Sequence, residues 1–292
     1  MTTVATAYLR EEIAHHWATA ATGLYIGGTA IGGMAGRLLT GFLATVFDWR
    51  AAIAGVGVLA LACAVTVALL LPRSRRFHPT PLNPGALNAN ARRMILDRGL
   101  LTLYGLGFCL MGAFVAVFNG LAFRLFAAPY SLTPAAASLI YLTSAVGSFA
   151  STYAGRLASR FGSRAVEPWT IAVFVAGILL LTLATPLPVI AIGVCLISVG
   201  FFAAHGVASA WVSARASRKG PGTGLAAALY LFAYYLGSSI CGALAGAAWS
   251  AGGWGAVVGL SASVCGIGLL LSLSMRGVPL VPIRVEARPV EH

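Results

Sequence analysis

Charged residues are scarce in this sequence. They make up 9% of its 292 residues, whereas a typical soluble domain carries about 25%. Hydrophobic residues make up 59%, and a chain of this composition has too few polar side chains to cover a surface that faces water. An ordinary soluble enzyme is therefore disfavoured, and a chain embedded in a membrane is indicated.

Acidic residues are the rarest charged group, with 7 against 19 basic residues and a net charge of +12. The basic residues are spread between apolar runs and do not form a patch, which is typical of membrane topology and not of a nucleic-acid interface. No nucleic-acid partner is therefore expected. Each acidic residue lies at the edge of an apolar run or in a tail, so the sequence predicts no carboxylate embedded in a span.

Motifs for cofactor or metal chemistry are missing as well. The five cysteines lie inside apolar runs and form neither a Cys-x-x-Cys pair nor a Cys/His cluster, which predicts buried free thiols and no metal site. No phosphate-binding glycine loop occurs, and no cofactor is expected. His205 and Ser209 lie four residues apart, but no orienting acid or Gly-x-Ser-x-Gly elbow accompanies them, so enzymatic activity is not expected.

Long apolar runs dominate the chain. Only a helix satisfies its own backbone hydrogen bonds inside lipid, and about 20 residues suffice to cross the hydrocarbon core. Eight runs of this kind predict an all-α integral membrane protein with about eight transmembrane helices. The predicted spans are 19–46, 51–71, 100–121, 135–154, 166–185, 188–211, 223–249 and 254–275.

The basic residues test this topology. Eight spans place both termini on one side, and sixteen of the nineteen basic residues then lie on that side. Arg50 and Arg124 lie on the other side, and Arg37 lies within a span. Because cytoplasmic loops of membrane proteins carry the excess of basic residues, both termini are expected in the cytoplasm and the chain in the cell inner membrane, as a multi-pass protein.

The spacing of the spans predicts four regions. Residues 1–71 hold two spans and are interpreted as the remnant of an N-terminal bundle. The Pro- and Arg-rich residues 72–98 are interpreted as a cytoplasmic linker. Residues 99–277 form a six-helix bundle, and residues 278–292 form a cytoplasmic tail.

Two distant segments align when the chain is shifted by 205 residues. Leu24 then meets Leu229, and Tyr25 meets Tyr230. Residues 100–205 have no partner upstream. If the protein consists of two similar halves, three to four helices are missing from the first, so an N-terminally truncated copy is expected.

Several motifs resemble those of the major facilitator superfamily. The similarity covers nearly the whole chain, as helices five to twelve of the family with the last turn of helix four. It rests on Ala7–Glu12, Gly23–Gly28, Ile31–Arg37, Asp48–Arg50, Gly155–Arg164 and Leu229–Ser239. The resemblance implies two six-helix halves related as parallel repeats, of which the first three helices are absent here.

One of these motifs resembles the family's second cytoplasmic loop signature. Its matching residues are Gly155, Arg156, Arg160, Gly162 and Arg164. This chain has Ser159 where the family normally has aspartate, which leaves a charge-relay role of this loop open.

The resemblance implies a secondary active transporter that exports a small organic solute in exchange for protons, by alternating access across the lipid bilayer. Its expected partners are therefore the solute, protons and lipid. The alternative is a non-transporting membrane protein, either a truncated remnant or a structural or interaction subunit.

Polar side chains within the spans are the candidate substrate-binding residues. A charge buried in a membrane usually faces a cavity or a partner, which favours Arg37. His205 can exchange protons near neutral pH, and the polar-tipped side chains of Asn119, Tyr230 and Tyr234 can line a cavity. Each of these residues can instead serve helix packing.

Three glycines share one helix face. Gly28, Gly32 and Gly36 follow one another at intervals of four, which permits the close approach of another helix. The face is interpreted as a packing surface that can also act in gating.

Overall fold

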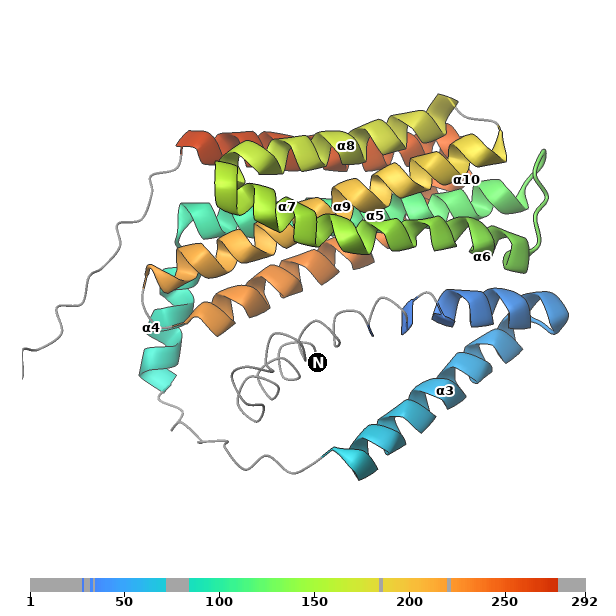
Figure 1. Cartoon of the computed structure of the whole chain (residues 1–292), viewed down its shortest axis with the longest axis horizontal. Coiled ribbons are helices and arrows are strands. Elements are labelled where there is room, and N and C mark those ends of the chain that lie inside the picture. The colour runs from blue at the N-terminus through green and yellow to red at the C-terminus, as the bar shows by residue number, and fades with distance from the viewer. Residues whose placement is uncertain are drawn as a thin grey trace, which may run out of the picture.

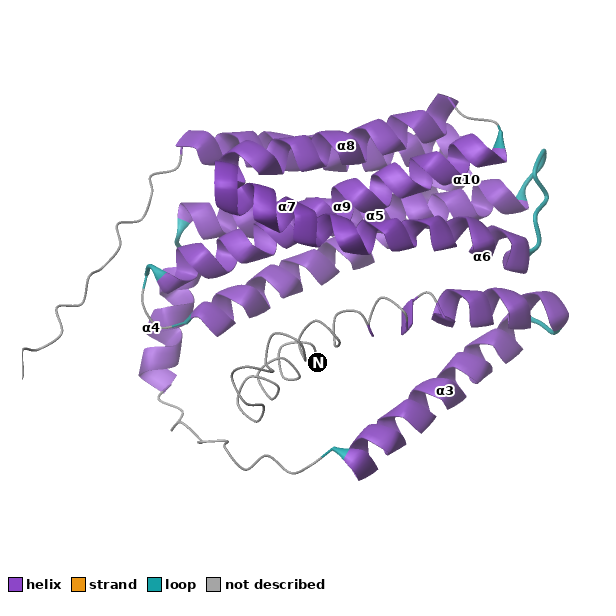
Figure 2. Ribbon diagram, viewed as in Figure 1, coloured by secondary structure: helices purple, strands orange, loops and turns teal. Residues whose placement is uncertain are grey.

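A computed structural model describes residues 28, 32–33, 35–71, 84–183, 186–219 and 222–277. Within these ranges every regular element is a helix (Figure 2). The all-α fold class predicted from the apolar runs is therefore confirmed. The tail 278–292, the motif Ala7–Glu12 and the first part of the predicted span 19–46 lie outside the described residues.

Most helices match predicted spans. A helix over Ala35–Val46 is followed by α3 (Trp49–Leu70), α4 (Pro84–Ile95), α5 (Arg98–Phe126), α6 (Pro134–Leu142), the 3₁₀ turn η1 (Thr143–Val146), α7 (Gly147–Phe161), α8 (Ser163–Leu183), α9 (Leu187–Ser217), α10 (Thr223–Ser274) and the 3₁₀ turn η2 (Met275–Gly277). In the described ranges, six continuous helices are long and apolar enough to cross a membrane.

The longest helix, α10, comprises two of the predicted spans. Its 52 residues would extend about 78 Å as one rod, whereas the hydrocarbon core of a membrane is about 30 Å thick. The backbone leaves helical geometry at Gly252 and Gly253, and Gly253 has φ 60°. Only glycine adopts this conformation readily, so the two glycines form the turn that was predicted between spans 223–249 and 254–275.

One predicted span needs correction, and the predicted linker contains a helix. The span predicted over 135–154 runs from Pro134 to Phe161 as α6, η1 and α7, because η1 continues the rod without a loop. The linker predicted over 72–98 contains the helix α4, whose Met94 is fully buried in the hydrophobic core while its arginines stay exposed. An amphipathic helix forms here because one of its faces has this apolar contact.

The cysteines are free, as predicted, but their burial differs. Cys109, Cys241 and Cys265 are buried and Cys195 is half-buried. Cys63 is exposed on α3, which contradicts the prediction that all five are buried. The reason is that α3 packs little of its surface against the other described helices: its apolar side chains point outward.

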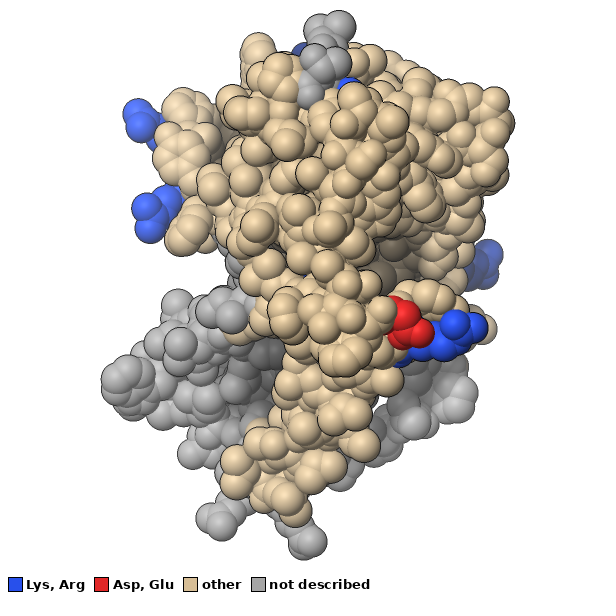
Figure 3. All heavy atoms as spheres, turned by 90° about the vertical axis from the view of Figure 1, so that its right-hand side faces the viewer, with Lys and Arg blue, Asp and Glu red and all other residues tan. Residues whose placement is uncertain are grey.

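Basic side chains gather at one end of the helices. This end, which we call the cation-rich end, holds α4, the α7–α8 turn and the α9–α10 connection (Figure 1). Its basic residues are Arg92, Arg93, Arg98, Arg156, Arg160, Arg164, Arg215, Arg218, Lys219 and Arg276. Arg50 and Arg124 lie at the opposite end, which Figure 3 shows with few charged side chains. The observed distribution follows the predicted alternation of the spans.

The core forms where α5 packs along α10, where α9 packs against both, and where α8 packs against α9 and α10. Gly237 of α10 lies directly against the backbone of Phe108 of α5: a Cβ atom built at Gly237 would fall 2.8 Å from the Phe108 carbonyl carbon. The two helices can therefore approach this closely only because position 237 has no side chain.

Candidate functional site

Three of the candidate residues lie together. His205 on α9 shares a hydrogen bond of 3.0 Å between its Nδ1 and the Oη of Tyr230 on α10. The ring of Tyr234, one turn further along α10, lies 4.7 Å from the His205 ring between centroids. We call these three residues the His–Tyr cluster. The sequence singled out each of them, and the packing of α9 against α10 brings them together.

A pocket adjoins the His–Tyr cluster. It has a volume of about 250 Å³, and its lining includes His205, Tyr230, Ser209, Ser213 and Leu231. The hydroxyl of Ser209 donates a hydrogen bond to the carbonyl of Gly206 in its own helix. The pocket thus has a polar wall made of an imidazole, a phenol and two hydroxyls, a lining suited to a small solute with hydrogen-bonding groups.

Glu167 on α8 is an embedded carboxylate that the sequence prediction missed. Its side chain is fully buried, and neither of its carboxylate oxygens has a hydrogen-bond partner. It lies within electrostatic range of Tyr230. The sequence placed Glu167 at the edge of span 166–185, but α8 begins at Ser163 and α9 continues to Ser217. Glu167 lies at the edge of an apolar run in the sequence, but it is buried in the fold because the neighbouring helices pack over it.

Arg37 lies apart from the pocket residues, in a second aromatic setting. Its guanidinium lies 5.1 Å from the ring centroid of Phe118 on α5 and 5.3 Å from that of Tyr141 on α6. The hydroxyl of Tyr141 donates to the carbonyl of Phe118. In the described structure, the guanidinium of Arg37 thus interacts with two aromatic rings by cation–π contact.

A row of aromatic rings connects Arg37 with the His–Tyr cluster. From Phe118 it continues to Phe114 at 4.2 Å, to Phe201 at 4.1 Å and to His205 at 6.0 Å, all between ring centroids. The sequence predicted the residues at the two ends of this row as separate candidates. The row itself was not predictable, because it depends on how α5 and α9 face each other.

The contact of Arg37 with two rings leads to a testable expectation. Arg37→Gln should lower the free energy of unfolding by about 1 kcal/mol, because the amide keeps polarity but loses the cation–π attraction. Thermal unfolding of the detergent-solubilised chain measures the effect. The matched control is Arg50→Gln, because Arg50 lies over the ring of its neighbour Trp49 on the same helix and should change stability less. An equal loss in both variants would contradict this assignment.

Asn119 links α5 to α10. Its Nδ2 donates to the carbonyl of Gly242 over 3.4 Å, a long hydrogen bond between two helices. This contact fits the packing interpretation, and its predicted role in lining a cavity stays a prediction.

The glycine face of the first predicted span has no close neighbour among the described residues. Within the described ranges, no atom lies within 4 Å of a Cβ built at Gly28, Gly32 or Gly36. The close approach of this segment occurs at Gly41 instead, where a Cβ would fall 2.8 Å from the carbonyl oxygen of Pro134 at the start of α6. The packing or gating role of the three-glycine face therefore stays a prediction.

The loop signature forms the turn between α7 and α8. Gly162 ends α7 with φ 85°, a conformation that favours glycine, and its N–H donates to the carbonyl of Ala158. Arg156 and Arg160 are exposed, and the Arg160 guanidinium lies 5.1 Å from the Phe161 ring centroid. No atom lies within 4 Å of a Cβ built at Gly155. The glycine at 162 is thus required by the turn.

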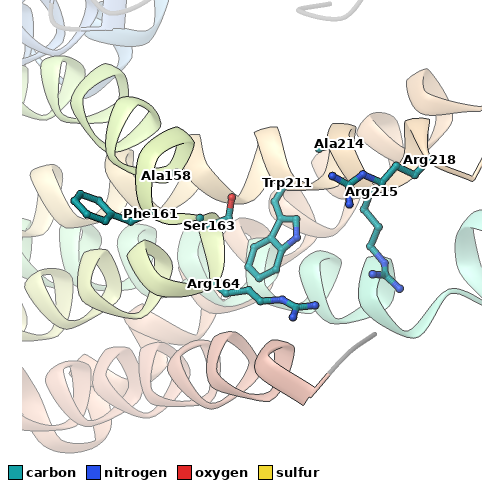
Figure 4. A pocket seen from close by; sticks show the side chains of 9 residues that line it. Ala158, Phe161, Ser163, Arg164, Trp211, Ala214, Arg215 and Arg218 are labelled. Atoms are coloured by element: carbon teal, nitrogen blue, oxygen red, sulfur yellow. The ribbon is translucent and has the colours of Figure 1, made fainter. Parts of the chain in front are cut away.

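A second pocket lies beside this turn at the cation-rich end (Figure 4). Its volume is about 390 Å³, and Arg164, Trp211, Arg215 and Arg218 contribute to its lining. Ser159 occupies the position at which the family's loop signature normally has aspartate. Its hydroxyl donates a hydrogen bond to the carbonyl of Gly155 in its own helix. The pocket is therefore cationic, and Ser159 adds no negative charge beside it.

Asp97 joins three elements at the cation-rich end. It caps the N-terminus of α5 by accepting a hydrogen bond from the backbone N–H of Leu100. Its carboxylate also pairs with Arg215 and Lys219, which lie at the end of α9 and just beyond it. Burial alone would raise the pKa of Asp97, but the hydrogen bonds from Arg215, Lys219 and Leu100 outweigh it and lower the pKa to about 2. The sequence identified Asp97 only as an acidic residue at the edge of an apolar run.

No group of three or more His, Cys, Asp or Glu side chains that could hold a metal ion occurs within the described ranges.

The helices, their alternating ends and the polar cluster inside them define a multi-pass α-helical membrane protein.

The chain belongs to the Major Facilitator Superfamily, whose family model matches residues 1–228. It is 43% identical over 264 residues to the inner membrane transport protein YnfM of Escherichia coli, which covers 90% of this chain and 62% of the relative. It is 39% identical over 269 residues to the uncharacterized MFS-type transporter YybF of Bacillus subtilis, covering 92% of this chain and 66% of the relative. The chain therefore spans somewhat less than two thirds of the length of these relatives, and the family predicted from the motifs is confirmed.

Proposed function

We propose that this chain acts in the secondary active transport of a small organic solute, which it exports in exchange for protons by alternating access. The observation that carries the proposal is the pocket beside the His–Tyr cluster, where a titratable imidazole and polar-tipped aromatic rings lie between transmembrane helices. The family membership supports transport as the class of activity.

The proposed orientation places the cation-rich end in the cytoplasm of a bacterial cell, with the chain in the inner membrane and both termini cytoplasmic. The gathering of ten described basic residues at that end supports it. We further propose that residues 1–71 belong to one bundle and residues 99–277 to the other, joined by residues 72–98 and followed by the tail 278–292.

A flux assay tests the transport activity. The purified full chain is reconstituted in liposomes with an imposed pH gradient, and three probes are offered separately: ethidium, L-arabinose and benzoate. We expect gradient-driven flux of at least one probe. Tyr234→Ala should reduce that flux about tenfold, because the substitution removes a ring from the His–Tyr cluster.

The matched control for Tyr234→Ala is Tyr153→Ala, because Tyr153 is exposed on α7 and should leave flux unchanged. If both substitutions reduce flux equally, the pocket is not the binding site. Absence of flux for every probe, with the chain correctly reconstituted, would favour the alternative of a non-transporting membrane protein. The apolar surface of α3 faces outward. This surface favours the non-transporting alternative, because a helix of a partner protein can pack on it.

A further inference from the structure

Glu167 is a fully buried acid near the start of α8. Its exposed fraction is 0%, and both carboxylate oxygens are without hydrogen bonds. An ionised carboxylate in such a place costs several kcal/mol unless a cation or several donors compensate. The neutral acid avoids this cost, and a chain that keeps an acid here at this cost has a use for it that an apolar residue cannot fulfil.

The surroundings of Glu167 determine where its proton can go. From α10, Tyr230 lies within electrostatic range of the carboxyl group. From α9, His205 is hydrogen-bonded to Tyr230. On α8 itself, Arg164 lies three residues earlier. The charged residues of α7 nearest this end, Arg156 and Arg160, have exposed side chains.

Tyr230 thus interacts electrostatically with the buried acid and also lines the pocket. Tyr230 is 1% exposed, and a Cβ built at Gly107 of α5 would fall 2.6 Å from its ring, so the ring packs closely against α5. Both Tyr230 and His205 belong to the lining of the pocket of about 250 Å³. A phenol and an imidazole joined by a hydrogen bond can pass a proton between a buried group and a pocket.

We propose that Glu167 is a proton-carrying residue of this protein, and that it exchanges its proton with the pocket through Tyr230 and His205. Neither Glu167 oxygen is hydrogen-bonded in the described structure, so the proposed route includes one water molecule between the carboxyl group and the phenol. In the transfer, the Glu167 carboxyl proton moves to this water, a proton of the water moves to the phenol oxygen of Tyr230, and the phenol proton moves to Nδ1 of His205. Glu167 is then a carboxylate, Tyr230 is neutral and His205 is a cation. The inference rests on the proposed function, because it supplies the titratable group that exchange of solute for protons needs.

Infrared spectroscopy of the purified full chain tests the proton site without any transport. A protonated carboxylic acid has a carbonyl stretching band that a carboxylate lacks. We expect this band at neutral pH in the unaltered chain, its loss in Glu167→Gln, and its retention in the control Asp48→Asn, because Asp48 is an exposed N-cap. Absence of the band in the unaltered chain, or its persistence in Glu167→Gln, would overturn the proposal.

A second variant covers the case in which Glu167→Gln does not fold. Glu167→Asp keeps the acid but shortens it by one methylene, so the carbonyl band should shift. A band at an unchanged position would belong to another acid and would equally overturn the proposal.

Hydrogen–deuterium exchange of the same band tests the route. Tyr230→Phe removes the phenol oxygen from the route and should slow the exchange at least tenfold, and His205→Gln should slow it as well. An unchanged exchange rate in Tyr230→Phe would show that the proton leaves by another path, which would refute the route.

A transport experiment distinguishes this inference from the proposed function. In liposomes, Glu167→Gln should lose pH-driven net flux of a transported probe but keep exchange of labelled for unlabelled probe. If the unaltered chain transports none of the three probes yet shows the Glu167 band, the proposed function fails and the proton site stands. If pH-driven flux persists at full rate in Glu167→Gln, the coupling role fails.

Discussion

Gly237→Ala is expected to destabilise the chain by about 3 kcal/mol, one of the largest effects of any single methyl group here. The new Cβ would lie against the carbonyl oxygen of Phe108 and 2.9 Å from the Phe108 Cα. These atoms belong to the backbone of α5, so no change of side-chain rotamer can relieve the overlap and the two helices must separate. Thermal unfolding in detergent, followed by size-exclusion elution, measures the loss.

The matched control is Gly246→Ala on the same helix. No atom lies within 4 Å of a Cβ built at Gly246. Alanine is the better helix former by about 0.5–1 kcal/mol, so this variant should be as stable as the unaltered chain or slightly more stable. Two alanine substitutions nine residues apart thus have opposite expected signs. Equal destabilisation of both would mean that α5 and α10 are not in backbone contact at Gly237.

Asp97→Asn is expected to cost about 2 kcal/mol of stability at neutral pH. Asparagine caps helices as well as aspartate does, so the substitution removes the charge that pairs with Arg215 and Lys219 while keeping the N-cap. The size follows from the pKa of Asp97, which is lowered from 3.8 to about 2, because each pKa unit corresponds to about 1.4 kcal/mol.

The pH dependence of this effect has a definite sign. A carboxyl group with a lowered pKa in the folded state stabilises the fold above its unfolded pKa of 3.8 and loses that contribution as the pH falls to about 2. The stability difference between Asp97→Asn and the unaltered chain should therefore be constant above about pH 5 and shrink towards pH 2. The matched control is Asp48→Asn, a substitution at an exposed N-cap, and an equal pH-dependent change in both variants would contradict the role of the ion pairs at Asp97. A pH-independent cost at Asp97 would contradict the ion pairs.

The positions of the spans were predictable from the sequence because lipid imposes a strong physical constraint. A backbone in hydrocarbon must form its hydrogen bonds internally, so each apolar run of sufficient length becomes a helix. The turn at Gly252 and Gly253 was predictable for a related reason, since consecutive glycines interrupt a helix readily. The run over 135–161 was predicted too short, because the polar residues of α7 still continue the helix.

The facing of side chains within the spans was harder to predict. In a span that is apolar all round, no hydrophobic stripe tells which side faces the protein and which faces lipid. Glu167 illustrates this, because its burial follows from the cover that the neighbouring helices provide over the first turns of α8. Arg37 is a second case: its place within an apolar run was readable from the sequence, but its contact with Phe118 and Tyr141 depends on how the segment Ala35–Val46 packs on α6.

Lys219 is the single lysine of the sequence, and it is also one of the two cations held by Asp97. Its side chain is 27% exposed, so a reagent that acylates lysine amines can reach it. While the amine is held against the Asp97 carboxylate, that contact covers part of it and slows the attack of the reagent. The rate at which this one amine is acylated therefore reports, from a single native position, whether the end of α9 is docked on the start of α5.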